Sequence, residues 1–296
     1  MENVFPPIFI GGSGRSGTTL LVDMLGLHKD LSPIYETDFV SYIIDLFYRS
    51  SKEKFYENKL KYRKYVEQWS ELLPQRPHNK QTYERYVHGP HYINFSKQEM
   101  RDVTDKFLSE LTLANIDKSV ITYLNELFSL HSKNDNKLCW VNKTPAYVNY
   151  SEQLLKWFPN MKFIHIIRDG RDVALSVRDR IGPKDFSVLA DWWMNQVLLG
   201  MSFGRKHPHN YIEVKYEDLI LTPSKTLNFI FNSLRDSNQR VDNNQLEDII
   251  EQSYDLNESM IGKWKAYPYQ EEIFEFTTKS NTLLQYLEYG GISKNV

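Results

Sequence analysis

Short apolar runs alternate with longer segments of mixed helical character along the chain. Four runs are rich in apolar and β-prone residues, and each ends at a polar or glycine-rich stretch: Ile8–Ile10, Leu138–Val141, Lys162–Ile167 and Tyr211–Lys215. Helical patterns follow two of them, over residues 18–27 and from about 170 to 177. Short continuous strands separated by helices are typical of a parallel sheet covered on both faces. The pattern predicts a doubly wound α/β fold.

A long segment between the first two strands has a different character. From about Asp38 to Leu130, Tyr, Lys and Glu recur at helical spacing, and Ser96 with Glu99 forms the signature of a capping box. We expect a helical insertion at residues 38–135 within a single domain of residues 1–296. Long insertions in such folds tend to border the binding site, so a wall or lid is the expected role. A surface excursion without a role is the alternative.

Composition limits the classes of partner and the compartment. The 296 residues are 41% hydrophobic and 25% charged, with a formal net charge of -2, so no global basic field exists for nucleic acid or an acidic membrane. Any anion site must be local. The single cysteine, Cys139, allows no intrachain disulfide, which fits a reducing compartment. With neither a signal-peptide pattern nor a long apolar run, a cytoplasmic location without a membrane span is expected.

The stretch from Gly12 to Thr19 has the spacing of a loop that cradles phosphate. In such loops backbone N–H groups and the N-terminus of the next helix surround an anion. P-loop nucleoside triphosphatases carry a lysine where this chain has Thr18, so the group that reaches the terminal phosphates of ATP is missing. Arg15 instead places a guanidinium inside the loop, able to make bidentate contacts to phosphate or sulfate oxygens. An ordinary turn between strand and helix is the alternative.

A second candidate for anion binding follows the strand at 162–167. Arg168 stands at the carboxyl end of that strand, where ligands bind in open α/β sheets, and Ser176 follows about two helical turns later. The alternative is that the charges of residues 168–172 form a solvated cluster of salt bridges at the start of a helix. Asp169 and Asp172 suit the helix N-terminus electrostatically, so we interpret them as structural.

These two stretches resemble a known family. Residues 11–21 (GGSGRSGTTLL) and 166–176 (IIRDGRDVALS) are similar to the two nucleotide-binding motifs of sulfotransferases that use 3'-phosphoadenosine 5'-phosphosulfate (PAPS). The similarity is strongest to the branch with protein-tyrosine sulfotransferases and related bacterial enzymes. It covers the first 40 residues and about 138–180, and more loosely 211–223 and 260–265. It implies a P-loop-like sheet, with PAPS as donor and adenosine 3',5'-bisphosphate (PAP) as product.

The resemblance also implies which residues bind the donor. The 5'-phosphosulfate would lie in the loop formed by Gly14, Arg15, Ser16, Gly17, Thr18 and Thr19. Arg168 and Ser176 match the arginine and serine that hold the 3'-phosphate. Lys263 and Trp264 lie in a segment similar to the loop that closes over the 3'-phosphate and adenine, although they depart from its stricter signature. Residues 216–219 (YEDL) also recur in the family, as a structural element beside the sheet.

Sulfuryl transfer needs an in-line nucleophile, a base, and positive charge where the leaving phosphate gains electrons. By the resemblance, Lys143 stabilises the leaving group together with Arg15, and Glu36 is the general base. Asp38 or a histidine is the alternative base, since many relatives use histidine. His165 lies within a strand pattern, so we expect it in the core. No cluster of residues has metal-ligand spacing, and a donor of this kind needs no metal.

The sequence therefore predicts a PAPS-dependent sulfotransferase that acts on a hydroxyl or amine. A small metabolite is the expected acceptor, and a peptide tyrosine or a carbohydrate is the alternative. Two other classes stay open: a diverged P-loop nucleotide kinase and a non-catalytic PAP-binding protein. The absence of the P-loop lysine argues against the kinase.

Overall fold

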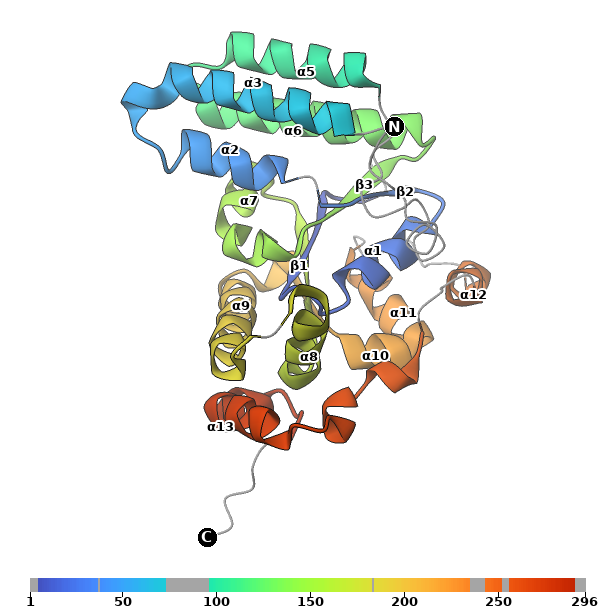
Figure 1. Ribbon diagram of the computed structural model, residues 1–296. Helices are drawn as coiled ribbons and strands as arrows, with labels where there is room; N and C mark the ends of the chain where they lie inside the picture. Colours follow the sequence, from blue (N-terminus) through green and yellow to red (C-terminus); the bar gives the residue numbers. More distant parts are fainter. Residues whose placement is uncertain are drawn as a thin grey trace. The chain divides into compact units, whose positions relative to one another are not determined.

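The computed structural model describes residues 5–36, 38–72, 96–182, 184–234, 243–251 and 256–290 (Figure 1). The chain divides into two compact units. The first contains Met1–Phe9, Leu21–Thr144 and Glu152–Met161, and the second contains Ile10–Leu20, Pro145–Ser151 and Lys162–Val296. In the part of the chain that is described, no helix combines the length and the apolar character that a membrane crossing requires.

Five strands form a parallel sheet in the order β2-β3-β1-β4-β5. They are β1 (Ile8–Gly12), β2 (Leu31–Ile34), β3 (Cys139–Lys143), β4 (Lys162–Ile167) and β5 (Tyr211–Lys215). The predicted α/β class, a parallel sheet flanked by helices, is confirmed. The sequence pattern did not reveal β2, because Ser32 and Pro33 interrupt its apolar residues. Since β2 comes first in the strand order, its proline, which has no N–H to donate, is tolerated.

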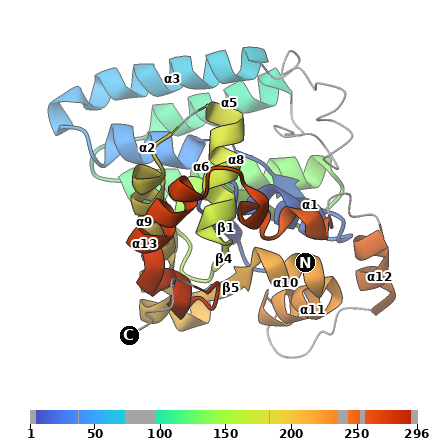
Figure 2. The same ribbon diagram turned by 60° about the horizontal axis from the view of Figure 1, so that its bottom comes forward.

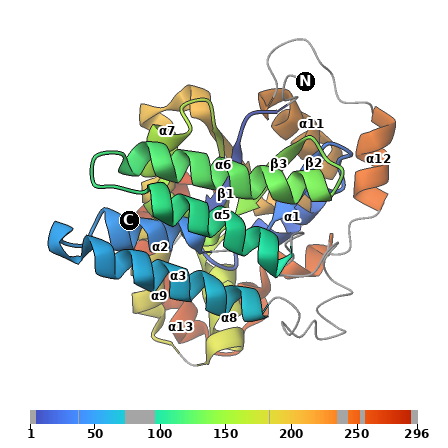
Figure 3. The same ribbon diagram turned by 90° about the horizontal axis from the view of Figure 1, so that it is seen from above.

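Helices dominate the first unit. They are α2 (Phe39–Phe47), α3 (Phe55–Leu72), α5 (Lys97–Glu110) and α6 (Ile116–Asn134), with most of α1 (Thr18–Gly26), most of α7 (Ser151–Trp157) and a 3-10 turn at Lys52–Lys54. Helix α5 contacts both α3 and α6, and the three lie side by side in Figure 3. The capping box of Ser96 and Glu99 is present in full at the start of α5. The described part of the predicted insertion is therefore helical.

Aromatic side chains hold these helices together. The ring of Phe107 stacks on that of Tyr123 with centroids 4.4 Å apart, and Tyr62 meets both rings edge-on. Such pairs contribute roughly 0.5–1.5 kcal/mol each beyond the area they bury. Residues 73–95 of the insertion lie outside the described residues, and the role of the insertion as wall or lid stays a prediction.

The second unit contains the helices that follow β4 and β5. They are α8 (Gly170–Ile181), α9 (Phe186–Lys206), α10 (Tyr216–Leu221), α11 (Pro223–Leu234), α12 (Asn243–Glu251) and α13 (Gln270–Tyr286), with 3-10 turns at Pro145–Asn149, Pro208–Asn210, Glu258–Met260 and Lys263–Ala266. Helix α9 packs against α8 and α13 (Figure 2). Trp193 is fully buried among them, and a Cβ on Gly170 would come within 2.5 Å of its ring. Glycine at 170 therefore lets α8 approach α9.

A second glycine brings the ends of β1 and β4 together. A Cβ on Gly12 would lie 2.4 Å from the carbonyl oxygen of Ile166, so no larger residue fits without a shift of backbone. Gly12 is the last residue of β1, and β4 ends at Ile167. The loop after β1, which leads into α1 (Thr18–Gly26), and Arg168 after β4 consequently leave the sheet next to each other.

Candidate active site

The loop from Ser13 to Gly17 makes a tight turn between β1 and α1. Arg15 and Gly17 both have left-handed backbone conformations, with φ of 71° and 91°. The N–H of Ser16 donates to the Ser13 carbonyl at 3.2 Å, and the two serine hydroxyls are hydrogen-bonded. A Cβ at Gly17 would lie 2.4 Å from the ring of Tyr216. A non-glycine residue in this conformation is uncommon and costs energy, and turns of this kind direct N–H groups at anions.

The side chain of Arg15 reaches the helix that follows β4. Its Nε donates to the hydroxyl of Ser176 at 3.0 Å. Ser16 and Thr18 are buried, and Thr19 is half-buried in the first turn of α1. Gly14 faces Trp192, whose ring would lie 3.7 Å from a Cβ at that position. The structure thus brings the loop next to Ser176, a residue predicted to contact the opposite end of the nucleotide.

Arg168, in the second unit, is a buried cation that is bonded to backbone carbonyls. Its side chain is 4% exposed, and it donates to the carbonyl oxygens of Arg15 at 3.2 Å and Met260 at 2.6 Å. The guanidinium also lies over the ring of Tyr216, 4.3 Å from the centroid. Its Nε is buried and has no hydrogen-bond partner, and within the described ranges no carboxylate forms an ion pair with it. A buried guanidinium with spare donors fits an anionic ligand.

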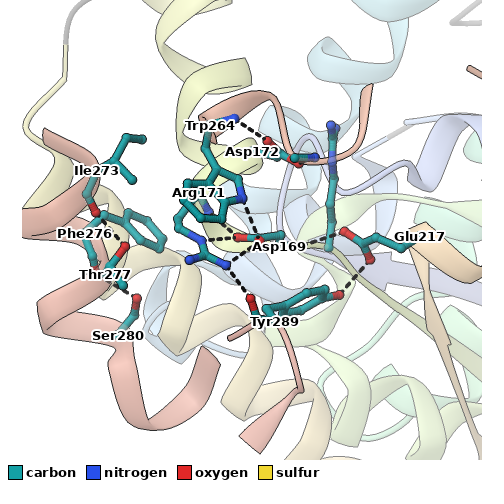
Figure 4. A network of polar contacts seen from close by, with 12 residues as sticks. Asp169, Arg171, Asp172, Glu217, Trp264, Ile273, Phe276, Thr277, Ser280 and Tyr289 are labelled. Carbon is teal, nitrogen blue, oxygen red and sulfur yellow. Dashed lines mark hydrogen bonds and ion pairs between the residues drawn. The ribbon is translucent and has the colours of Figure 1, made fainter. Parts of the chain in front are cut away.

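The charges that follow Arg168 form a buried network (Figure 4). Asp169 caps α8 through the N–H of Arg171 and accepts two further hydrogen bonds from its guanidinium, at 3.0 and 2.7 Å. Asp172 is 2% exposed, and burial raises its pKa. The alternative of a solvated cluster of salt bridges therefore does not describe this site. Glu217 accepts from the N–H of Asp169 and from the hydroxyl of Tyr289, and burial raises its pKa too.

The C-terminal segment around Trp264 joins the same network. The indole N–H donates to Asp169 at 3.1 Å, and the guanidinium of Arg171 stacks 3.7 Å from the ring centroid. The backbone N–H groups of Gly262 and Trp264 donate to the two oxygens of Asp172. Lys263 is exposed. The structure therefore places Trp264 against the start of α8, while Lys263 extends from the surface of the segment.

Lys143 and Glu36 form an ion pair in the first unit. The register of the parallel strands β2 and β3 pairs Ile34 with Asn142, so the residues that follow emerge side by side from the carboxyl ends of the two strands. The Lys143 ammonium lies 2.7 Å from a carboxylate oxygen of Glu36, with the lysine side chain 2% and the glutamate 43% exposed. It also lies 5.7 Å from the ring centroid of Tyr35, whose hydroxyl donates to Asp23. A buried ammonium thus has both a carboxylate and a π-face.

The other candidate bases differ in exposure. Asp38 is exposed at the start of α2, in a left-handed conformation with φ of 52°. His165 is fully buried within β4, as its strand pattern predicted, and burial lowers its pKa to about 3. A histidine that stays neutral and inaccessible is a poor base for an external acceptor. Within the described ranges no cluster of three or more His, Cys, Asp or Glu side chains could hold a metal ion.

Sequence reasoning missed several contacts of the candidate residues. Tyr216 belongs to the recurring YEDL stretch, but nothing in that stretch showed that its ring would lie under Arg168. The carbonyl of Met260 carries no side-chain signal at all. Tyr35 carries no signal in the sequence beyond its position next to Glu36. The spacing of residues within one motif could not have found these contacts, because each joins segments far apart in the sequence.

Comparison with known proteins adds independent information. The model of the sulfotransferase family matches residues 6–235 of the chain. Protein-tyrosine sulfotransferase 1 of Danio rerio is 27% identical over 229 residues, which cover 74% of this chain and 50% of that protein. The human protein of the same name is 29% identical over 178 residues, covering 59% and 34%. The chain spans about half the length of the first curated relatives it matches.

Two solved structures share the fold. The sulfotransferase domain from the curacin biosynthetic pathway matches with a TM-score of 0.55 and 16% identity, covering 98% of this chain and 100% of that one. The sulfotransferase domain of the Synechococcus PCC 7002 olefin synthase matches with a TM-score of 0.53 and 20% identity, covering 94% and 95%.

The parallel sheet flanked by helices, with the loop after β1 and Arg168 after β4 at its carboxyl end, defines the α/β class of the protein. Because the family model matches well over half of the chain, the protein belongs to the sulfotransferase family. The resemblance predicted from the sequence is confirmed.

Proposed function

We propose that the protein transfers a sulfuryl group from PAPS to a hydroxyl or amine of an acceptor. The observation that carries the proposal is the environment of Arg168. Its guanidinium is buried, its Nε has no hydrogen-bond partner, and its Nη1 donates to the backbone carbonyl of Arg15 in the glycine-rich loop. Two places for negative charge, the loop and Arg168, thereby adjoin each other in one unit. One nucleotide with phosphate groups at both its 3' and 5' positions matches that arrangement. Membership of the sulfotransferase family supports it further.

Several candidate residues of the second unit are then assigned to donor binding. The N–H groups of the loop and the guanidinium of Arg15 hold the 5'-phosphosulfate, while Arg168 and Ser176 hold the 3'-phosphate. Trp264 belongs to the segment that contributes the Met260 carbonyl to Arg168, and we assign this segment to the nucleotide as well. When bound, PAPS supplies the sulfuryl group. Metal-free transfer stays a prediction.

Lys143 and Glu36 are assigned to the chemistry, on the basis of the family resemblance and their ion pair. In the transfer, the bond from sulfur to the bridging phosphate oxygen breaks, and a bond from sulfur to the acceptor atom forms. Glu36 takes the proton of the acceptor, and Lys143 stabilises the negative charge on the leaving phosphate. A lysine already paired to the base can shift toward the leaving group as the carboxylate becomes protonated.

Thermal unfolding with ligands tests this proposal against its rivals. A ligand at about 100 times its Kd adds roughly 2.7 kcal/mol to the free energy of unfolding. PAP should raise Tm, whereas ATP with magnesium should not. Stabilisation by ATP with magnesium alone would favour a nucleotide kinase. Stabilisation by PAP without consumption of PAPS in any acceptor pool would favour a non-catalytic PAP-binding protein.

The acceptor classes left open are a small metabolite, a peptide tyrosine and a carbohydrate. We retain a small metabolite as the first, in line with the expected cytoplasmic location. Sulfation of a peptide tyrosine is the second, favoured by the sequence similarity to protein-tyrosine sulfotransferases. Incubation with PAPS and either a metabolite extract or a set of tyrosine peptides, followed by mass spectrometry for added sulfate, distinguishes the first two. Sulfated peptides without sulfated metabolites would overturn the first assignment.

A further inference from the structure

The carboxylate of Asp172, in the first turn of α8, binds two backbone N–H groups of residues 260–264, one of them that of Trp264 (Figure 4). One oxygen of Asp172 accepts the N–H of Gly262 at 2.7 Å, and the other accepts the N–H of Trp264 at 3.1 Å. Gly262 has φ of 70°, a left-handed turn that glycine adopts without strain. Both bonds are charge-assisted and nearly inaccessible to water, since Asp172 is 2% exposed.

The same segment supplies an acceptor to the candidate phosphate-binding arginine. Arg168 donates to the carbonyl of Met260 on one side and to that of Arg15 in the loop on the other. These two carbonyls fix the plane of the guanidinium. If residues 260–264 were released, Arg168 would lose one of the two and could rotate about its side chain.

Neither acidic residue at the start of α8 neutralises Arg168 through an ion pair in the described part of the chain. Asp169 is engaged by the guanidinium of Arg171 and the indole of Trp264, and Asp172 by the two backbone N–H groups. The carboxylates nearest in sequence are therefore committed to the C-terminal segment and to Arg171. The positive charge of Arg168 stays available to a ligand.

We infer that Asp172 is a positioning residue for the donor nucleotide: it anchors residues 260–264 against Arg168 and so orients this arginine for the 3'-phosphate. The inference rests on the proposed function. It assigns to Asp172 a role beyond stabilising the helix N-terminus. Loss of the Asp172 charge should therefore weaken the binding of PAP. Simple electrostatics predicts the opposite, because removal of a negative charge near a phosphate site would tighten binding.

Calorimetric titration of the full chain with PAP and with AMP, which lacks the 3'-phosphate, tests the inference. If Asp172→Asn leaves the segment anchored about a tenth of the time, the affinity for PAP falls about tenfold, because only the anchored fraction binds well. The affinity for AMP should change less than about twofold. Asp179→Asn is the matched control, since Asp179 is exposed on the same helix and its substitution removes the same charge. It should leave both affinities unchanged.

Hydrogen exchange provides a second measurement that needs no ligand. The amides of Gly262 and Trp264 should exchange faster in Asp172→Asn than in the wild type or in Asp179→Asn. An unchanged or tighter affinity for PAP in Asp172→Asn, or unchanged exchange of these amides, overturns the inference. A wild-type protein with no preference for PAP over AMP would instead overturn the proposed function itself, and the inference with it.

A second variant keeps the test decisive if Asp172→Asn does not fold. Trp264→Phe retains a ring for Arg171 and removes only the indole N–H bond to Asp169. It should weaken PAP binding a few-fold relative to the wild type and again leave the affinity for AMP unchanged. Unchanged PAP affinity together with unchanged exchange of residues 260–264 would then overturn the inference.

Discussion

Lys143 in the first unit and Arg168 in the second are both buried cations, and their charges are compensated in opposite ways. Arg168 is 4% exposed and Lys143 2%. Arg168 meets two backbone carbonyls and the face of Tyr216, without an ion pair to a carboxylate in the described ranges. Lys143 lies 2.7 Å from the carboxylate of Glu36.

Under the proposed function, this difference separates a residue assigned to donor binding from two residues assigned to the chemistry. A buried charge that is only partly compensated is costly, and an anionic ligand that pairs with it removes that cost. Arg168 is thereby suited to hold a phosphate that does not change during the reaction. A cation paired with a titratable carboxylate can instead exchange partners when a proton or negative charge moves. Lys143 and Glu36 are suited to the reacting end.

Loss of the base should produce the largest effect. Replacing Glu36 by Gln removes the group proposed to accept the proton, and general bases contribute about 10²–10⁴-fold, so kcat should fall by roughly 10³. Glu57→Gln is the control, because Glu57 forms an exposed ion pair with Lys61 in the same unit. Steady-state kinetics with PAPS and the identified acceptor measure both. A kcat within a few-fold of wild type would leave Glu36 as a partner of Lys143 only.

Removal of the buried ammonium comes next. Lys143→Met keeps the length of the side chain and deletes the charge, so kcat should fall by about 10² if the ammonium meets charge that develops in the transition state. KM for PAPS should change less. Lys61→Met, which breaks the exposed pair with Glu57, should leave kcat unaltered. An unchanged kcat in Lys143→Met would remove this lysine from the mechanism and break the contrast with Arg168.

For Arg168 the comparison predicts a defect in binding rather than in turnover. Hydrogen bonds to charged groups contribute about 1.5–3 kcal/mol, so Arg168→Gln should weaken PAP roughly 10- to 100-fold. Binding of AMP should change little, as should kcat at saturating PAPS. Arg178→Gln, on the helix that follows Arg168, is the control. Equal losses for PAP and AMP would show that Arg168 does not select the 3'-phosphate.

His165 differs from both cations because burial favours its neutral form. Burial lowers its pKa to about 3, against 6.5 for the unperturbed group. Between these values the unfolded chain binds a proton that the folded chain does not. The free energy of unfolding should therefore fall with decreasing pH from about 6.5 downward, by up to about 1.4 kcal/mol per pH unit from this group.

Urea unfolding at several pH values measures this slope. His165→Gln should flatten it, whereas His209→Gln, at an exposed histidine, should not. An equal slope in wild type and His165→Gln would show that the burial of His165 does not govern stability in this range.

Much of the architecture follows from local signals. Strands β4 and β5 have the predicted bounds, and Ser96 with Glu99 caps α5. Each depends on residues within a few positions of one another, where steric preference and backbone hydrogen bonding act directly. Strand β2 escaped detection because its local pattern is unfavourable at Pro33. The strand forms because it pairs with β3, more than a hundred residues later in the sequence.

The sequence by itself determined the sheet class, the phosphate-type loop without its lysine, and the identity of the cations that could meet an anion. Only the tertiary structure decided how each cation is compensated: Arg168 by the carbonyls of Arg15 and Met260, and Lys143 by Glu36. The reason is physical. The type of a side chain fixes its charge, but burial and the partners brought by distant segments decide what that charge can bind.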